Sequence, residues 1–271
     1  MEESYKVSDW QRALQQLIDG RREVAAPIGP LPDAVSPIDL KEAMRLQDAL
    51  NARLVAEEYG EIVGTKIGCT TQVMQEYLGM PHPCSGAIFD TTVQQRHGRF
   101  DFEKFHHVGV ECEIAVTLGN SISPRRAPHT LKTVEEAVAS VHAAIEVVDD
   151  RYVDFENRVP DWRTWVADDF FGAGAVLGPP LEDWRKMDLS ETLGIMTING
   201  VQVGSGVGRD IINGHPLEAL VWLANEQSAM GRELPAGWIV MLGSVVQTKW
   251  LQIGDQVEVQ LTGLGGVSAK F

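Results

Sequence analysis

Apolar residues occupy every even position from Val108 to Leu118, and polar or small residues occupy most odd ones. Because strand side chains point alternately to two faces, this pattern predicts a strand whose even face is buried. Glu111 and Glu113 share the opposite face, which is otherwise lined by Gly109, Ala115 and Thr117. Two interpretations stay open: an edge strand with a solvated acidic face, or two mutually repelling carboxylates that bind a divalent cation.

A second apolar run, residues 141–148, also predicts a buried strand. Here Glu146 stands between Ile145 and Val147, where an unpaired charge would be costly. A third carboxylate in an apolar strand favours the metal site over the solvated face.

Helical spacing and capping residues predict five helices, over residues 8–20, 37–59, 71–78, 133–140 and 217–230. The first is expected to start at a capping box, Ser8 to Gln11, and to stop at Gly20. Short strands are predicted over 62–68, 87–90, 172–178, 195–198, 201–203, 238–242, 256–261 and 267–271. Asn199-Gly200 indicates a type I′ hairpin. The glycine run 204–208 lacks the spacing of a nucleotide-binding loop. These elements together predict an α+β chain.

The net charge of -15 and the pI near 4.8 argue against nucleic acid and anionic membranes as partners. Cys69, Cys84 and Cys112 form no paired motif, so we expect neither disulfides nor a zinc site. No apolar run reaches about 18 residues, and the acidic start does not look like an export signal. We therefore expect a cytoplasmic protein without a membrane span.

Several motifs in order resemble the 2-keto-4-pentenoate hydratase and 4-oxalocrotonate decarboxylase group of the fumarylacetoacetate hydrolase superfamily. They are Lys66-Ile67-Gly68, Glu111-x-Glu113, Glu146-Val147-Val148-Asp149-x-Arg151, Val166-Ala167-Asp168 and Gly263-Leu264-Gly265-Gly266-Val267. The likeness covers nearly the whole chain. It implies a small N-terminal α/β portion, residues 1–79, followed by a mixed β-roll catalytic domain, residues 80–271.

The resemblance also implies a site. Glu111, Glu113 and Glu146 match the three carboxylates that hold Mg²⁺ or Mn²⁺, and Lys66 matches the lysine beside the substrate. We expect catalytic roles for Lys66, whose pKa a confined site would lower, and for Asp168. Substrate contacts are expected from Ile67, Gly68, Asp90 and Lys249. Arg151 is expected to pair with an internal acid.

Two departures from the group bear on the reaction. Cys84-Ser85 stand where its hydratases carry an acid followed by an aromatic residue, so one proposed acid/base is missing. Asp169-Phe170-Phe171 replace an Asn-Ala-Ser sequence. His82, His106 or His107 are candidates to replace the missing acid/base.

The resemblance implies a metal-dependent hydratase that adds water to a 2-hydroxy-2,4-dienoate, or its 2-oxo-4-enoate tautomer, in aromatic catabolism. Three alternatives stay open: decarboxylation of a 4-oxalocrotonate-like dicarboxylate, C–C hydrolysis of an acylpyruvate, and a non-catalytic partner subunit. The expected partner is a small 2-oxo or 2-hydroxy acid. Assembly is expected to be homo-oligomeric, with a hydratase/decarboxylase subunit pair as a further option.

Overall fold

Two β-sheets and the helices around them form the chain, whose computed structural model describes residues 2–22 and 24–271. The seven-stranded sheet has the order β2-β1-β10-β5-β6-β7-β3, and the five-stranded sheet has the order β4-β12-β11-β8-β9. In the larger sheet the strands are β1 Ile62–Gly68, β2 Cys84–Phe89, β3 Val93–Gln95, β5 Val108–Leu118, β6 Val138–Asp149, β7 Gly172–Leu177 and β10 Ile239–Trp250. The smaller sheet contains β4 His97–Arg99, β8 Leu193–Ile198, β9 Val201–Val207, β11 Gln256–Leu261 and β12 Gly265–Lys270.

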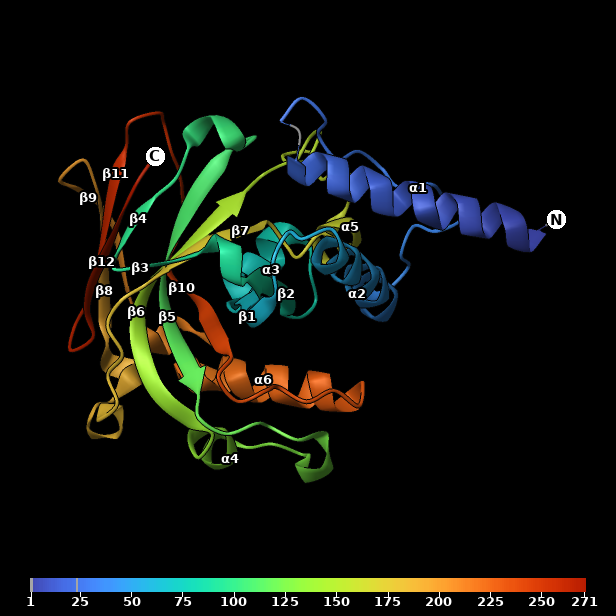
Figure 1. Ribbon diagram of the computed structural model, residues 1–271. Coiled ribbons are helices and arrows are strands. Elements are labelled where there is room, and N and C mark those ends of the chain that lie inside the picture. Colours follow the sequence, from blue (N-terminus) through green and yellow to red (C-terminus); the bar gives the residue numbers. More distant parts are fainter. Residues whose placement is uncertain (1, 23) are drawn as a thin grey trace.

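The long strands β5 and β6 run through the centre of the molecule (Figure 1). The five-stranded sheet lies on one side of them, and helices α1, α2 and α5 gather on the other. The helices are α1 Glu2–Arg22, α2 Leu40–Ala56, α3 Gln72–Leu78, α4 Leu131–Glu135, α5 Trp162–Ala167 and α6 Pro216–Ala229. This mixture of helices with two sheets confirms the predicted fold class.

The even face of β5 is buried as its alternation predicts. Its side chains pack in one hydrophobic core with residues of β6, β11, β12 and α6. The β5 residues in this core are Val108, Val110, Cys112, Ile114, Val116 and Leu118. The opposite face of β5 therefore points away from this core. Since β6 pairs antiparallel with β5 and sets Glu146 directly across from Glu111, the carboxylates of both strands emerge on that same face.

Several predicted boundaries are wrong, among them those of α2, β2 and β9, and in three further elements a wider context overrides the local signal. Helix α1 begins at Glu2 and ends at Arg22, so Ser8 lies inside it; the Ser8 side chain of the predicted cap is outside the described residues. Helix α4 ends at Glu135, because residues 138–140 pair with β5 instead. Strand β10 continues to Trp250 because β5 offers a partner along its length.

Two other local predictions are confirmed. Asn199 and Gly200 both have positive φ, 52° and 79°, as a type I′ turn requires. Residues 204–207 form part of strand β9 rather than a loop at the start of a helix. The division at residue 79 stays a prediction; β1, before it, pairs with β10, which lies after it. Among the described residues, no helix combines the length and apolarity needed to cross a membrane.

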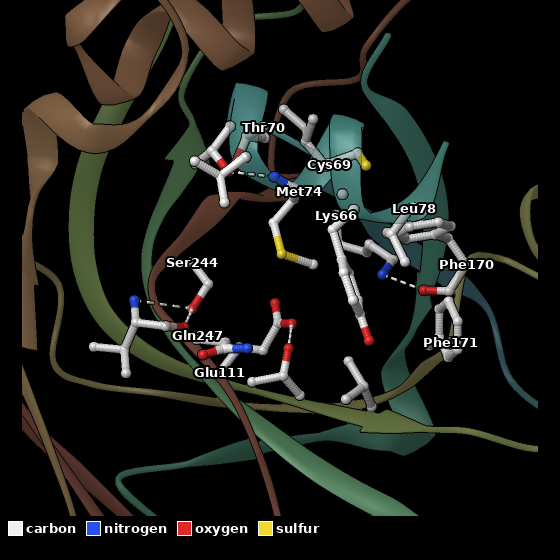
Figure 2. Close-up of a pocket in the computed structure, with 18 of the residues that line it drawn as sticks. Lys66, Cys69, Thr70, Met74, Leu78, Glu111, Phe170, Phe171, Ser244 and Gln247 are labelled. Atoms are coloured by element: carbon white, nitrogen blue, oxygen red, sulfur yellow. Dashed lines mark hydrogen bonds between the residues drawn. The ribbon is translucent and has the colours of Figure 1, made fainter. Parts of the chain in front are cut away.

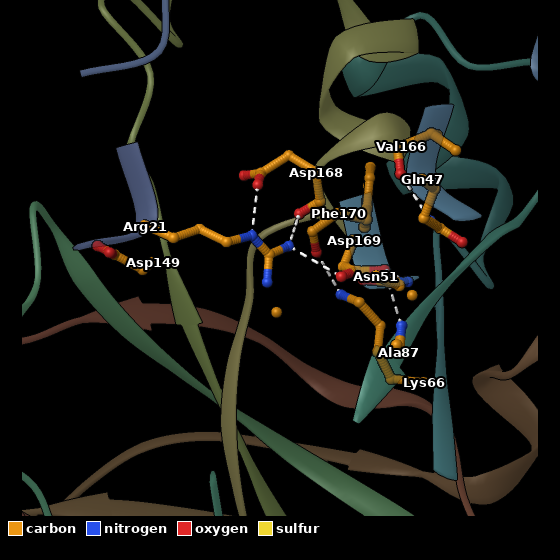
Figure 3. Close-up of polar contacts among 12 residues, drawn as sticks. Arg21, Gln47, Asn51, Lys66, Ala87, Asp149, Val166, Asp168, Asp169 and Phe170 are labelled. Carbon is orange, nitrogen blue, oxygen red and sulfur yellow. Dashed lines mark hydrogen bonds and ion pairs between the residues drawn. The ribbon is translucent and has the colours of Figure 1, made fainter. Parts of the chain in front are cut away.

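A buried polar network joins α1 to the segment that follows α5 (Figure 3). Arg21 donates from Nε to Asp168 Oδ1 at 2.7 Å and from Nη2 to Asp169 Oδ2 at 2.9 Å. Asn51 and the backbone N–H of Ala87 both donate to Asp169 Oδ1, each at 2.9 Å. Four elements that are distant in sequence thus meet at two buried carboxylates.

Arg151 and Tyr152 complete this network. Arg151 donates to Asp168 Oδ2 at 3.3 Å and to the Gly172 carbonyl at 2.7 Å, and Tyr152 donates to Asp168 Oδ2 at 3.2 Å. Arg151 therefore pairs internally, as the sequence predicts.

We expect Arg21→Met to lower the free energy of unfolding by about 3–5 kcal/mol, because it leaves two buried carboxylates without their shared cation. The neighbouring Arg22→Met is the matched control. Arg22 pairs with Glu57 at the surface, so its loss should cost about 1 kcal/mol or less. Urea unfolding measures both, and equal losses in the two variants would contradict the role given to Arg21.

Candidate active site

Three glutamates converge at the centre of the seven-stranded sheet. One carboxylate oxygen each from Glu111, Glu113 and Glu146 lies within 4.8 Å of the others. Strands β5 and β6 supply them, so the cross-strand register fixes their spacing. Among the described residues this is the one cluster of acidic, histidine or cysteine side chains with the spacing of a metal site. The metal interpretation is thus favoured over a solvated acidic face.

Burial and mutual repulsion perturb two of these carboxyl groups. Burial, followed by the charge of Glu146, raises the pKa of Glu111 to about 7. Burial and the charges of Glu146 and Glu111 raise the pKa of Glu113 well above its usual value. Glu113 is 0% exposed, and its Oε1 has no hydrogen-bond partner. A buried carboxylate oxygen with no donor fits a cation ligand, so the residues present suit a hard divalent ion.

The remaining oxygens of the cluster are held by β10. The backbone N–H of Gly243 donates to Glu113 Oε2 at 2.7 Å. The hydroxyl of Thr248 donates to Glu111 Oε1. Gly243 has a φ of 112°, and an added Cβ would meet the Thr70 hydroxyl at 2.0 Å, so the turn of the backbone here requires glycine.

Lys66 from β1 lies beside the cluster and is buried. Its Nζ donates to Glu146 Oε1 at 2.9 Å and also to the carbonyl of Phe170. Burial is the largest single effect and would lower the pKa of Lys66, but the surrounding acidic groups, Glu146 first, together outweigh it and the pKa is raised. The expectation of a lowered pKa is therefore wrong without a bound cation, because nearby negative charge favours the ammonium form.

The carbonyl that accepts from Lys66 belongs to a left-handed run of backbone. Asp169, Phe170 and Phe171 have φ values of 53°, 47° and 64°. Side chains of this kind rarely adopt positive φ, so the surroundings must hold the run in place. The contacts of Asp169 with Arg21, Asn51 and Ala87 do so.

A pocket of about 360 Å³ opens beside Lys66 and Glu111 (Figure 2). Ile67 and Gly68, from which substrate contacts are expected, line it, and their contact with a substrate stays a prediction. An added Cβ on Gly68 would approach the Phe170 ring to 2.3 Å, so glycine allows that ring to pack. Helix α3, strand β10 and the loop carrying Phe155 provide much of the remaining lining.

Three other predicted site residues do not line this pocket. Asp168 is fully buried, and its carboxylate is taken by Arg21, Arg151 and Tyr152. Asp90 accepts from the backbone N–H groups of Glu61 and Thr91 in a turn. Lys249 lies within β10, not in a loop as the sequence suggested. The catalytic role of Asp168 and substrate contact by Asp90 and Lys249 stay predictions that their positions do not support.

The candidates for the missing acid/base lie elsewhere too. His82 Nδ1 contacts the Pro83 carbonyl, His106 Nε2 contacts the Gly20 carbonyl, and His107 stacks on Trp250. Cys84 is buried, and burial raises its pKa well above the usual value, so its thiol stays protonated near neutral pH. None of these four side chains lines the described pocket.

Sequence reasoning missed the contribution of β10. Residues 243–248 hold the carboxylates and line the pocket, yet the predicted strand ends at Leu242. The register between β10 and β5 shifts repeatedly between Met241 and Lys249. These irregularities break the alternation that would have revealed a strand.

Comparison with known proteins agrees with this geometry. The family model described as fumarylacetoacetate hydrolase C-terminal matches residues 46–271. A 2-keto-4-pentenoate hydratase of Paraburkholderia xenovorans is 31% identical over 245 residues, covering 90% of this chain and 88% of the relative. A 4-oxalocrotonate decarboxylase of Pseudomonas putida is 34% identical over 218 residues, covering 79% and 80%.

Solved structures show the same fold. The 4-oxalocrotonate decarboxylase of Pseudomonas putida G7, complexed with magnesium and adipate, has a TM-score of 0.86 and 26% identity, over 99% of this chain and 98% of that one. Fumarylpyruvate hydrolase from Pseudomonas aeruginosa, complexed with Mn²⁺ and pyruvate, has a TM-score of 0.58 and 15% identity, over 78% and 89%, a likeness of fold alone. The chain belongs to the fumarylacetoacetate hydrolase family, within the group of 2-keto-4-pentenoate hydratases and 4-oxalocrotonate decarboxylases.

Proposed function

We propose that this protein is a divalent-metal-dependent hydratase of aromatic catabolism, acting on a 2-hydroxy-2,4-dienoate or its 2-oxo-4-enoate tautomer. The observation that carries the proposal is the cluster of three glutamates beside a buried lysine at one end of an apolar pocket. Several relatives named 2-keto-4-pentenoate hydratase, which are similar to this chain along most of its length, support the proposal.

The ion would be held by Glu111, Glu113 and Glu146. We propose that it is Mg²⁺ or Mn²⁺. A bound divalent cation supplies Lewis acidity, which stabilises negative charge on the 2-oxygen of a 2-oxo acid. Thr248 and Gly243 orient two of the carboxylates, Thr248 by donating to Glu111 Oε1 and Gly243 by donating to Glu113 Oε2. The other oxygen of Glu113 has no hydrogen-bond partner and would serve as a ligand.

Lys66 is proposed as the catalytic residue beside the substrate. Its raised pKa keeps the ammonium charged near neutral pH, so it can neutralise developing negative charge or donate a proton. In the overall reaction a proton reaches C5 of the dienol, which leaves a C3–C4 double bond conjugated with the 2-oxo group. Water then adds its hydroxyl to C4 and its proton to C3.

Decarboxylation is the second candidate, supported by the likeness to the 4-oxalocrotonate decarboxylases. The geometry favours C–C hydrolysis less, since among the described residues no histidine lines the pocket to activate water. A non-catalytic subunit has no use for three buried carboxylates beside a lysine, so we do not favour that alternative.

We also propose a cytoplasmic location and assembly into homo-oligomers, with a hydratase/decarboxylase subunit pair as a variant. The three cysteines are all buried and free, as expected in a reducing compartment. The proposed partner is a small 2-oxo or 2-hydroxy acid rather than nucleic acid or a membrane, consistent with the net charge of -15.

The function is tested with 2-hydroxypenta-2,4-dienoate, followed by ultraviolet absorbance in the presence of Mg²⁺, Mn²⁺ or a chelator. We expect metal-dependent loss of the dienol, with a product heavier by one water in mass spectrometry. If this substrate is not converted and carbon dioxide is released from 4-oxalocrotonate, the proposed reaction is decarboxylation and not hydration.

We expect Lys66→Met to lower kcat by roughly a hundredfold to ten-thousandfold, because the developing charge loses its cation. Divalent-metal binding, measured by calorimetry, should persist, since removing a positive charge does not weaken the glutamate cluster. Lys132→Met, at an exposed position on α4, serves as the control and should keep full activity. Unchanged kcat in Lys66→Met would exclude the role given to this lysine.

Metal stabilisation should grow with pH. The pKa of Glu111 is raised from 4.5 to about 7, and the pKa of Glu113 is also raised. The metal-free folded protein therefore keeps protons on these carboxyl groups at pH values where the unfolded chain has released them. The stabilisation of the metal-free fold by these bound protons is fully present below the usual carboxyl pKa and is lost as the pH rises through about 7. Bound metal requires the deprotonated carboxylates and reverses the loss.

The measurement is the difference in Tm between Mg²⁺-loaded and chelated protein from about pH 5 to about pH 8. We expect the difference to increase with pH, and Glu113→Gln to abolish most of it. A difference that stays constant over this range would contradict the assignment.

A further inference from the structure

The pocket beside the glutamate cluster has two chemically different sides (Figure 2). Glu111 and Ser244 lie on one side, Phe170 and Phe171 lie on the other, and Lys66 is between them. A 2-oxo acid held near Glu111 would therefore direct its far end past Lys66 toward the aromatic side.

The aromatic side is a continuous wall of rings. The ring centroids of Phe155 and Phe171 are 5.3 Å apart, those of Phe170 and Phe171 are 5.1 Å apart, and those of Phe155 and Trp250 are 6.5 Å apart. Further apolar side chains that line the pocket are Val73, Met74, Leu78, Val148 and Val246. Rings and branched chains at these spacings offer contact area to an apolar group. The neutral polar side chains of the lining are hydroxyl, amide and indole groups, which carry no positive charge for an anion: Thr70, Thr71, Tyr77, Ser244, Gln247, Thr248 and Trp250.

Charged groups on the pocket lining do not suit a second carboxylate. Among the described lining residues they are Lys66, Glu111 and Asp210. Lys66 already donates to Glu146 and to the Phe170 carbonyl, so its N–H groups are directed to these acceptors rather than to the far end of the pocket. Asp210 adds negative charge, which would repel one.

Two basic side chains near the pocket, Arg158 and His107, are engaged with other groups. Arg158 donates to the Tyr77 carbonyl, and its guanidinium carbon lies 5.8 Å from the centre of the Tyr77 ring. His107 stacks on Trp250 with centroids 4.4 Å apart, and its Nδ1 is 3.5 Å from a carboxylate oxygen of Asp150. Neither Arg158 nor His107 lines the pocket.

We infer that the substrate carries an uncharged alkyl or aryl group at the end remote from its 2-oxo acid, on C5 of the dienoate. The volume of about 360 Å³ falls in the range of pockets for drug-sized ligands, which a five-carbon acid would leave partly empty. This inference rests on the proposed function, because it names the substrate class of the same site.

Binding tests the inference without turnover. Calorimetry in the presence of Mg²⁺ compares three unreactive 2-oxo acids: 2-oxobutanoate, 2-oxooctanoate and the dicarboxylate 2-oxoadipate. We expect 2-oxooctanoate to bind about tenfold tighter than 2-oxobutanoate or better, and 2-oxoadipate to bind no tighter than 2-oxobutanoate. Tightest binding by 2-oxoadipate would overturn the inference.

Turnover separates the inference from the proposed function. We expect kcat/KM to be about tenfold higher or more for 2-hydroxyocta-2,4-dienoate than for 2-hydroxypenta-2,4-dienoate, and lowest for the C5 carboxylate, 2-hydroxyhexa-2,4-dienedioate. Hydration of the five-carbon dienoate with no gain from the propyl group would overturn the inference and leave the function standing. Hydration of none would overturn the function, and the binding series would then decide the inference by itself.

Phe155→Ala probes the wall at a residue that contacts neither the glutamates nor Lys66. We expect it to lower the ratio of kcat/KM for the eight-carbon over the five-carbon dienoate by about tenfold. Phe105→Ala is the matched control: Phe105 is also partly buried, but it packs against Phe100 and Phe271, away from the pocket. An unchanged ratio in Phe155→Ala, or an equal fall in Phe105→Ala, would contradict the wall's role.

Discussion

Repulsion among three closely spaced carboxylates, two buried and one partly exposed, is the constraint on which the rest of the site depends. Unit charges within 4.8 Å of one another repel by about 3.5 kcal/mol or more at an effective dielectric constant near 20. Three such pairs together approach the whole stability of a typical domain, so the cluster needs compensating charge or protons. That compensation can come from Lys66, from bound protons or from a divalent cation. Each of them ties the chemistry of the site to the stability of the fold.

The strands around the cluster make this arrangement rigid. Glu111 and Glu146 face each other across adjacent strands, so their spacing follows from backbone hydrogen bonds rather than from flexible loops. Strand β10 borders β5 on its other side and adds donors through Gly243 and Thr248. A site built on sheet register holds its geometry better than one built on loops, which suits an ion that requires fixed ligands.

Helical segments control the lysine and the shape of the pocket. The Arg21–Asp169 pair fixes a left-handed run whose carbonyl accepts from Lys66. The same run places Phe170 and Phe171 on the pocket wall. A helix near the N-terminus, outside the span matched by the family model, thus contributes to a site assembled on distant strands. The position of the Lys66 ammonium group and the shape of the pocket therefore both depend on one short segment, residues 169–171.

By itself, the sequence determined the elements with strong periodicity and the chemistry they carry. Alternation along β5 placed Glu111 and Glu113 on one face, and the apolar run around Glu146 marked a third carboxylate, because period and polarity are local properties. The motifs in order supplied the family, and with it the expectation of a divalent metal and of a role for Lys66.

Only the tertiary structure decided which groups meet. The β5–β6 register joins Glu146 to Glu111, long-range packing draws Asp168 into an internal network, and the irregular β10 reaches the cluster although its pattern breaks at Gly243. The pKa of Lys66 rises because acidic groups from other elements, Glu146 first, together outweigh the effect of its burial. Such properties belong to contacts between residues distant in sequence, and no local pattern encodes them.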